Sequence, residues 1–183
     1  KAASDPLGLH HASMGSNVSY GGITQSGASG SYTYAAKVGS ENLPVNYVSF
    51  WDALRFANWL HNGQGSGDTE TGAYTLTPDG IANNTATRNP GALVFLPSES
   101  EWYKAAYYDP ALPGYYDYPT ATDTPPTCAA PGSTPNTANC GNLALLPEVG
   151  AYTGSPSRYG SFDQGGNVFE WNEEIVDAAS RGC

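Results

Sequence analysis

The stretch from residue 109 to residue 141 limits most strongly what this chain can fold into. It is rich in Pro, Thr and Tyr and has little hydrophobic periodicity, so it predicts no long helix or extended strand. A long irregular stretch inside a compact domain is usually held in place by a disulfide or a metal ion. The whole chain is rich in Gly, Pro, Tyr, Ser, Thr and Asn. This composition predicts a fold with much ordered loop, held by aromatic packing rather than by long helices.

Two of the three cysteines, Cys128 and Cys140, flank a Pro/Thr/Asn loop within this stretch. We expect a disulfide between them, which is favoured over a pair of free buried thiols. A disulfide indicates an oxidising compartment, so the predicted location is secreted or extracytoplasmic, with any signal peptide outside this sequence. No run approaches the ~18 apolar residues of a membrane span, and no membrane insertion is expected. Cys183 is the odd cysteine, and its role stays open.

Two segments carry the capping signals of short helices. Ser49 is a typical N-cap residue, and Asp52 follows three positions later as its acidic partner. Residues 98–108 repeat this pattern, with Ser98 as the N-cap and Glu101 at the third helical position. The apolar residues of the first segment recur at helical spacing, at Ala53, Phe56, Ala57 and Leu60.

Short strands are predicted around these helices. Residues 92–96 form an apolar run bounded by Pro90 and Pro97, which is typical of a short buried strand. Residues 32–34 alternate as a short strand would, whereas the Gly/Ser-rich tract at residues 21–31 is expected to be irregular.

The charge balance excludes one class of partner. Seven Lys and Arg stand against seventeen Asp and Glu, a formal net charge of -10. Because a negative field repels phosphate backbones and anionic lipids, we expect no nucleic-acid partner. The same field suits cations, although acidity also keeps many secreted proteins soluble.

Three motifs in order resemble one family. Residues 44–59 resemble its "PV…VSW.DA..F..W" helix, and residues 96–102 resemble its "LPTEAEWE" helix. Residues 159–171 resemble its "YGLYDMAGNVWEW" segment. The chain therefore resembles the formylglycine-generating-enzyme (sulfatase-modifying factor) superfamily. The resemblance implies an α+β, C-type-lectin-like fold with two short helices and short strands, over a single domain at residues 1–183 that is expected to be incomplete at both ends.

The resemblance also implies a calcium site in the last motif. The family's ligands fall on the carboxylates of Asp163 and Glu170 and on the backbone carbonyls of Gly166 and Val168. Calcium takes six to eight hard oxygen ligands and often mixes carboxylates with carbonyls. Without the resemblance, a tight turn whose acids face water would be the simpler interpretation.

A second calcium site of the family is matched only in part. Its "AN(I)" stretch resembles residues 138–140, which implies the Asn139 side chain and the Cys140 carbonyl as ligands. The Asp-x-Phe partner of that site has no counterpart between Gly141 and Tyr152.

The catalytic segment of the family is not matched. That segment reads "RGGSW" and is followed by a cysteine pair that binds copper, and here Arg181 and Gly182 match only its start. Cys183 is not in the register of either catalytic cysteine, and Phe169 replaces a family tryptophan. Copper is therefore expected only if the missing segment follows in the parent protein.

Other chemistry has weaker signals. The His-x3-His-x-Glu motif of the ergothioneine-synthase branch is absent, so His10, His11 and His61 are interpreted as surface or capping residues. No Gly-x-Ser-x-Gly elbow of a serine hydrolase occurs. Paired-carboxylate glycosidase chemistry is suggested by Glu99, Glu101, Glu173 and Glu174. Glu99 and Glu101 are better explained by helix-terminus electrostatics.

The sequence thus leaves three hypotheses. The first is a calcium-stabilised, secreted, lectin-like module that binds an unknown protein, peptide or carbohydrate and has no formylglycine-generating activity as given. The second is a fragment of a copper-dependent oxidoreductase that converts a sulfatase-type cysteine to formylglycine. The third is a hydrolase with an unrecognised site. Catalytic residues stay unassigned under all three.

Overall fold

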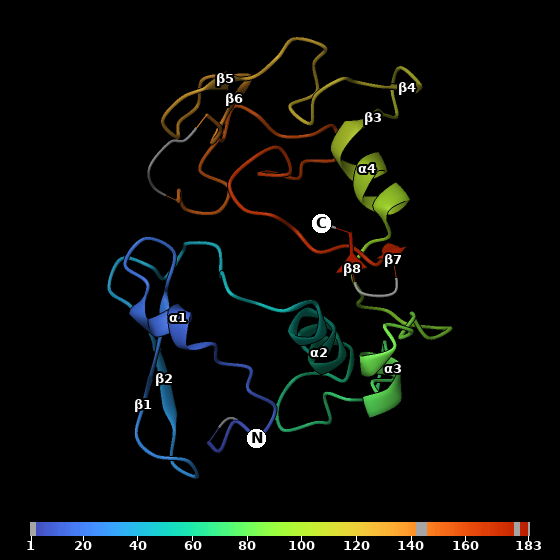
Figure 1. Cartoon of the computed structure of the whole chain (residues 1–183). Helices are drawn as coiled ribbons and strands as arrows, with labels where there is room; N and C mark the ends of the chain where they lie inside the picture. The colour runs from blue at the N-terminus through green and yellow to red at the C-terminus, as the bar shows by residue number, and fades with distance from the viewer. Residues whose placement is uncertain (1–2, 142–145, 178–179, 183) are drawn as a thin grey trace. The chain divides into compact units, whose positions relative to one another are not determined.

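The computed structural model describes residues 3–141, 146–177 and 180–182 (Figure 1). Cys183, whose role the sequence left open, lies outside these ranges. Short helices are mixed with short strands that pair only two at a time in the described ranges, which agrees with an α+β class. The elements are α1 (Ala12–Ser16), β1 (Ile23–Ser26), β2 (Thr33–Ala36), α2 (Phe50–His61), α3 (Pro78–Ala82), α4 (Glu99–Tyr107), β3 (Tyr108–Asp109), β4 (Gly114–Tyr115), β5 (Thr127–Cys128), β6 (Thr137–Ala138), β7 (Ile175–Asp177) and β8 (Ser180–Arg181).

The chain divides into two compact units that are interleaved in sequence. Among the described residues, the first unit comprises 48–99, 171–177 and 180–182, and the second comprises 3–47, 100–141 and 146–170. The first unit contains the predicted helix that follows Ser49, and the second contains the Cys128–Cys140 pair and the predicted calcium ligands. None of the described helices is long and apolar enough to cross a membrane.

Helix α2 begins where the capping signals predicted. The Ser49 hydroxyl accepts a hydrogen bond from the Asp52 amide, and the Asp52 carboxylate accepts one from the Ser49 amide. Its buried face is formed by Phe50, Leu54, Ala57 and Asn58. Phe56, one of the apolar residues at helical spacing, is 58% exposed and stacks on Trp59.

The core of the first unit forms around this helix. Leu54 and Tyr74 are almost completely buried in it, and Trp171 packs against it. The Asn58 side chain lies inside the same core, where its Oδ1 accepts a 2.7 Å hydrogen bond from the Tyr74 amide. Its Nδ2 donates to the carbonyls of Thr69 and Tyr74. A polar residue is therefore tolerated there because its hydrogen-bonding groups are paired.

The predicted strand at residues 92–96 does not form. The Ala92 amide closes a turn onto the Asn89 carbonyl, and Leu93 is 82% exposed. The Phe95 ring lies under the Arg88 guanidinium, 3.6 Å from its carbon to the ring centroid. Two backbone amides of the run donate to side chains from elsewhere in the first unit, so the run is held without strand pairing.

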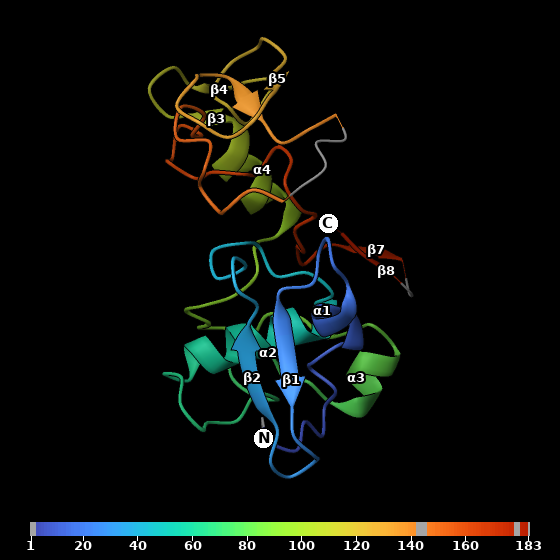
Figure 2. The same ribbon diagram turned by 90° about the vertical axis from the view of Figure 1, so that its left-hand side faces the viewer.

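The second unit contains a hairpin of β1 and β2, with α1 packed beside β1 (Figure 2). The strand predicted at residues 32–34 is confirmed in part as β2, and its partner β1 lies in the Gly/Ser-rich tract that was expected to be irregular. Helix α4 agrees with the second predicted helix within one residue at each end. Strands β3 and β4 form a short antiparallel pair immediately after it.

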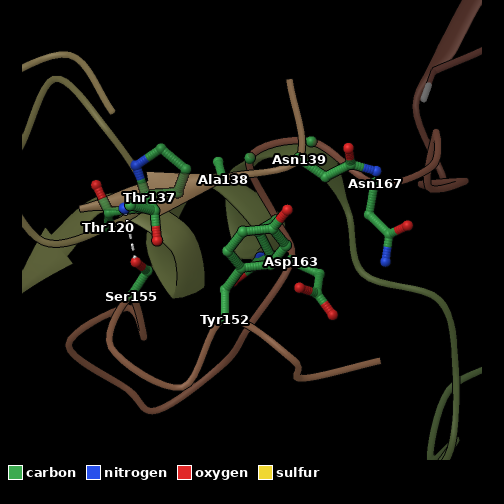
Figure 3. A pocket seen from close by; sticks show the side chains of 12 residues that line it. Thr120, Thr137, Ala138, Asn139, Tyr152, Ser155, Asp163 and Asn167 are labelled. Atoms are coloured by element: carbon green, nitrogen blue, oxygen red, sulfur yellow. Dashed lines mark hydrogen bonds between the residues drawn. The ribbon is translucent and has the colours of Figure 1, made fainter. Parts of the chain in front are cut away.

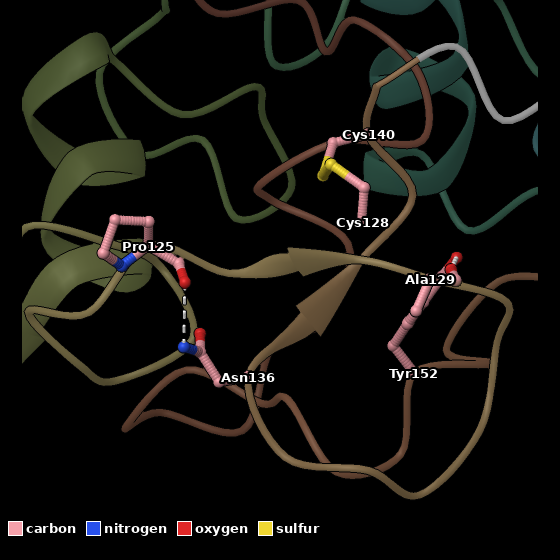
Figure 4. Close-up of a disulfide and its surroundings, with 6 residues drawn as sticks. All are labelled: Pro125, Cys128, Ala129, Asn136, Cys140 and Tyr152. Atoms are coloured by element: carbon pink, nitrogen blue, oxygen red, sulfur yellow. Dashed lines mark hydrogen bonds between the residues drawn. A yellow bond between two sulfur atoms is a disulfide. The ribbon is translucent and has the colours of Figure 1, made fainter.

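The predicted disulfide is confirmed (Figure 4). Cys128 and Cys140 are linked, with their Cα atoms 4.9 Å apart. Cys128 is the last residue of β5. Strand β5 pairs in parallel with β6, which ends two residues before Cys140. The Tyr152 hydroxyl donates a 2.8 Å hydrogen bond to the Ala129 carbonyl and fixes the same loop from another segment. The irregular stretch is thus held by a covalent link and by side-chain hydrogen bonds.

Candidate functional site

The loop at residues 163–170 has a backbone that few residues can adopt. Asp163, Gly166 and Asn167 all have left-handed backbone angles, with φ of 65°, 125° and 63°. A Cβ atom on Gly166 would lie 2.4 Å from the Asn139 carbonyl oxygen, so this position requires glycine. The Asn167 amide donates a 3.3 Å hydrogen bond to that same carbonyl. The end of the disulfide loop therefore supports the 163–170 loop.

Asp163 is fixed from one side by the backbone. Its Oδ2 accepts a 2.7 Å hydrogen bond from the Gly150 amide. The Tyr152 ring lies beside its carboxylate (Figure 3), and burial together with the Asp163 charge raises the pKa of the Tyr152 hydroxyl. The negative charge of Asp163 therefore acts on a neighbouring side chain of the second unit, the Tyr152 hydroxyl.

Glu170 is fixed by an aromatic side chain. Its Oε2 accepts a 2.7 Å hydrogen bond from the Trp102 indole nitrogen. Burial raises the pKa of Glu170, the Trp102 hydrogen bond opposes this, and the negative charge of Asp163 raises it further. The two carboxylates therefore repel each other when both are ionised.

Two cavities adjoin this loop. The smaller one has a volume of about 20 Å³, enough for roughly one water molecule, and Asn139, Asp163, Gly166 and Asn167 are among its lining residues (Figure 3). The larger one has a volume of about 360 Å³. It is lined by Pro44, Val149, Gly150, Phe162, Asp163, Asn167, Val168 and Glu170.

The predicted ligands are brought together in two groups. Asp163, Val168 and Glu170 line the larger cavity, whereas Asp163, Gly166 and Asn139 line the smaller one. Asp163 belongs to both, so it joins the first predicted site to part of the second. Cys140, whose backbone carbonyl was the predicted ligand, lines neither cavity.

The donor set of this loop fits a hard cation better than a soft one. No group of three or more His, Cys, Asp or Glu side chains suited to a metal occurs in the described ranges. A cation at the loop would therefore need amide and backbone oxygens beside the two carboxylates, as calcium sites commonly provide. The Oδ1 atom of Asn167 is buried, has no hydrogen-bond partner among the described residues, and belongs to a side chain that lines both cavities. Sequence reasoning missed this residue, since an unpaired atom is visible only in three dimensions.

Each of the three histidines lies within hydrogen-bonding distance of a backbone group, and His11 has the capping role that the sequence interpretation expected. His11 is the N-cap of α1 and accepts a hydrogen bond from the Ser13 amide. His10 Nε2 lies 3.1 Å from the Ile23 carbonyl, and His61 accepts from the Leu93 amide.

The first unit contains a buried polar network that sequence reasoning did not find. Glu173, considered there as half of a carboxylate pair, is bound by Arg88 at 2.7 Å and accepts a hydrogen bond from the Tyr74 hydroxyl. Arg181 is 9% exposed and donates to the carbonyls of Asn84, Ala86 and Glu173. These contacts indicate a structural use of Glu173.

Comparison with known proteins agrees with the motifs. A family model described as the sulfatase-modifying factor enzyme 1-like domain matches residues 16–183. Hercynine oxygenase of Mycobacterium tuberculosis is 39% identical over 77 residues, which cover 42% of this chain and 16% of that protein. Hercynine oxygenase of Mycolicibacterium thermoresistibile is 42% identical over 77 residues, with the same two shares.

The aligned stretch thus spans only 16% of the length of each of these relatives. No solved structure matches the chain significantly. The family model nevertheless covers nearly the whole chain and includes all three motifs and both loops of the candidate site. The chain therefore belongs to the sulfatase-modifying factor enzyme 1-like domain family.

Proposed function

We propose that this chain is a calcium-stabilised module in which one calcium ion is held by the 163–170 loop. The observation that carries the proposal is that Asp163 and Glu170 line one cavity, where each carboxylate is oriented by a hydrogen bond from the protein. Two carboxylates that repel each other in a partly buried loop favour a divalent cation between them.

The hydrogen bonds of the two carboxylates support this assignment. The Gly150 amide engages Oδ2 of Asp163, and the Trp102 indole engages Oε2 of Glu170. Each contact fixes the orientation of a ligand side chain, as outer-shell partners do in metal sites. In the family pattern the carbonyls of Gly166 and Val168 complete the ligand set, and calcium would supply charge neutralisation and cross-linking of the loop.

The wider role follows from the family resemblance. We propose a lectin-like fold that presents its long loops to a protein, peptide or carbohydrate ligand. The Cys128–Cys140 disulfide supports a secreted or extracytoplasmic location, because such links persist in oxidising compartments. The net charge of -10 supports a partner other than nucleic acid.

A second candidate function is oxidation by the whole protein. It is favoured by the similarity to two proteins named hercynine oxygenase and by Arg181 and Gly182, which match the start of the family's catalytic segment. Oxygen consumption by the full-length protein with hercynine, and separately with a Cys-x-Pro-x-Arg peptide and copper, tests this candidate. Turnover of either substrate above a protein-free control would establish it.

Thermal unfolding with millimolar calcium and with excess EGTA tests the calcium proposal. A ligand that binds only the folded chain stabilises it by about 2.7 kcal/mol at a hundredfold excess over Kd. We expect chelation to lower the melting temperature, and Glu170→Gln to reduce that difference. Glu148→Gln is the matched control, since Glu148 is exposed and lines neither cavity. Superimposed melting curves of a protein shown to contain no calcium would end the proposal.

A further inference from the structure

The Asn167 side chain has an amide oxygen whose hydrogen-bonding capacity is unsatisfied among the described residues. Its Oδ1 is buried and has no hydrogen-bond partner among the described residues. Nearly all buried polar side-chain atoms in folded proteins are paired with protein, water or an ion. An acceptor left unpaired in this way therefore calls for a donor or a cation in the adjoining space.

The position of Asn167 points to a cation. Its side chain lines the larger cavity together with Asp163 and Glu170, and it lines the smaller cavity together with Asp163. Asp163 thus shares both cavities with Asn167, and Glu170 shares the larger one. An ionised carboxylate can accept but not donate hydrogen bonds, so neither residue can satisfy the unpaired oxygen directly.

The backbone holds Asn167 in this place. Its amide donates to the Asn139 carbonyl, and its φ of 63° is one that Asn adopts more readily than most residues. The flanking Gly166 closes the loop against the same carbonyl, which a Cβ atom would approach to 2.4 Å. The side chain is therefore presented from a preorganised turn.

We propose that the amide oxygen of Asn167 is a calcium ligand in its own right, beside the carboxylates of Asp163 and Glu170. This inference rests on the proposed function and adds a residue to the family-derived ligand set. Calcium requires six to eight oxygens and readily takes Asn carbonyl oxygens. Because Asp163 and Glu170 each give one oxygen to a hydrogen bond, a further neutral oxygen helps to complete the shell.

Terbium luminescence provides the test, since Tb³⁺ replaces Ca²⁺ at oxygen sites and the Trp102 indole beside Glu170 can sensitise its emission. The affinity of Tb³⁺, and of Ca²⁺ by displacement, is measured for wild type, Asn167→Gly and Asn167→Asp. Glycine keeps the left-handed backbone and removes the oxygen, so we expect binding to weaken by about tenfold or more. Aspartate keeps the shape and adds a charge, so we expect binding to strengthen several-fold.

Gln64→Gly and Gln64→Asp are matched controls, because exposed Gln64 also has a positive φ, of 69°, and lines neither cavity. They should leave the affinity unchanged. If wild type binds and both Asn167 variants match their controls, or if Asn167→Asp weakens binding, the side chain is structural and the inference is overturned. If wild type binds neither ion, the proposed function and the inference fail together. Circular dichroism of each variant shows that the measured chains are folded.

Discussion

The Trp102 indole donates a 2.7 Å hydrogen bond to the Glu170 carboxylate. Trp102 belongs to the motif at residues 96–102 and Glu170 to the motif at residues 159–171, so two of the three sequence motifs meet at one contact inside the second unit. The contact ties helix α4 to the candidate calcium loop. Gln164 reinforces this link, since its side chain donates to the Trp102 carbonyl at 3.4 Å.

Trp102→Phe should destabilise the chain by about 1–3 kcal/mol, because a partly buried carboxylate loses its donor. Urea unfolding at neutral pH measures the loss. Trp59→Phe is the control, since its indole donates to the Gly65 carbonyl at an exposed position and its removal should cost less. Equal losses in the two variants would contradict a special role for the Trp102–Glu170 bond.

Removing the Cys128–Cys140 link should destabilise the chain through its closed loop. The two cysteines are 12 residues apart in sequence, which corresponds to roughly 2–3 kcal/mol in the chain-entropy model. Urea unfolding of a Cys128→Ser, Cys140→Ser double variant measures this change. Alkylation of both thiols by iodoacetamide in non-reduced, denatured protein would show instead that the link is not formed in solution.

The Tyr74 hydroxyl should contribute to the free energy of unfolding of the first unit. It donates to Glu173 and accepts a 2.9 Å hydrogen bond from the Leu96 amide, and Tyr74 is only 1% exposed. Tyr74→Phe leaves both groups without this partner and should cost about 1–3 kcal/mol in unfolding experiments. Tyr115→Phe, at a residue that is 53% exposed, is the control and should cost little. A Tyr74→Phe variant as stable as this control would disprove the role.

Asp109 should make stability depend on acid pH. Hydrogen bonds from the Ala111 amide lower its pKa most, burial opposes them, and the Tyr116 hydroxyl, the Leu112 amide and Arg158 lower it further. A carboxyl with a lowered folded pKa adds stability above its unfolded pKa of about 3.9 and loses it as pH falls through the folded value.

The stability difference between wild type and Asp109→Asn should therefore be constant near neutrality and shrink below about pH 4. Urea midpoints at a series of pH values provide the measurement. A difference that persists undiminished at the lowest pH at which both proteins fold would contradict this assignment.

Local signals in the sequence predicted the local parts of the fold. Ser49 with Asp52 located the start of α2, and the spacing of Cys128 and Cys140 around an irregular loop indicated their disulfide, because each depends on residues close in sequence. The strand at residues 92–96 was predicted wrongly. Side chains distant in sequence replace strand pairing there, since the Leu93 amide donates to His61 and the Leu96 amide donates to the Tyr74 hydroxyl.

The sequence predicted those residues of the candidate site that match ligand positions of the family motif. The family resemblance identified Asp163 and Glu170, and the structure places both on one cavity. Asn167 was missed although it lies inside the motif, because an unpaired buried oxygen has no sequence signature. The Arg181 contacts with Asn84 and Ala86 were missed for a similar reason, since they join residues nearly a hundred positions apart.

Calorimetric titration of calcium into EGTA-stripped protein, with the Cys128–Cys140 disulfide intact, measures directly whether the 163–170 loop binds calcium. We expect saturable binding that Glu170→Gln weakens and Glu148→Gln leaves unchanged. Binding that is equal in all three proteins would place the ion elsewhere. No binding by the folded, disulfide-intact wild type would show that this chain has no calcium site.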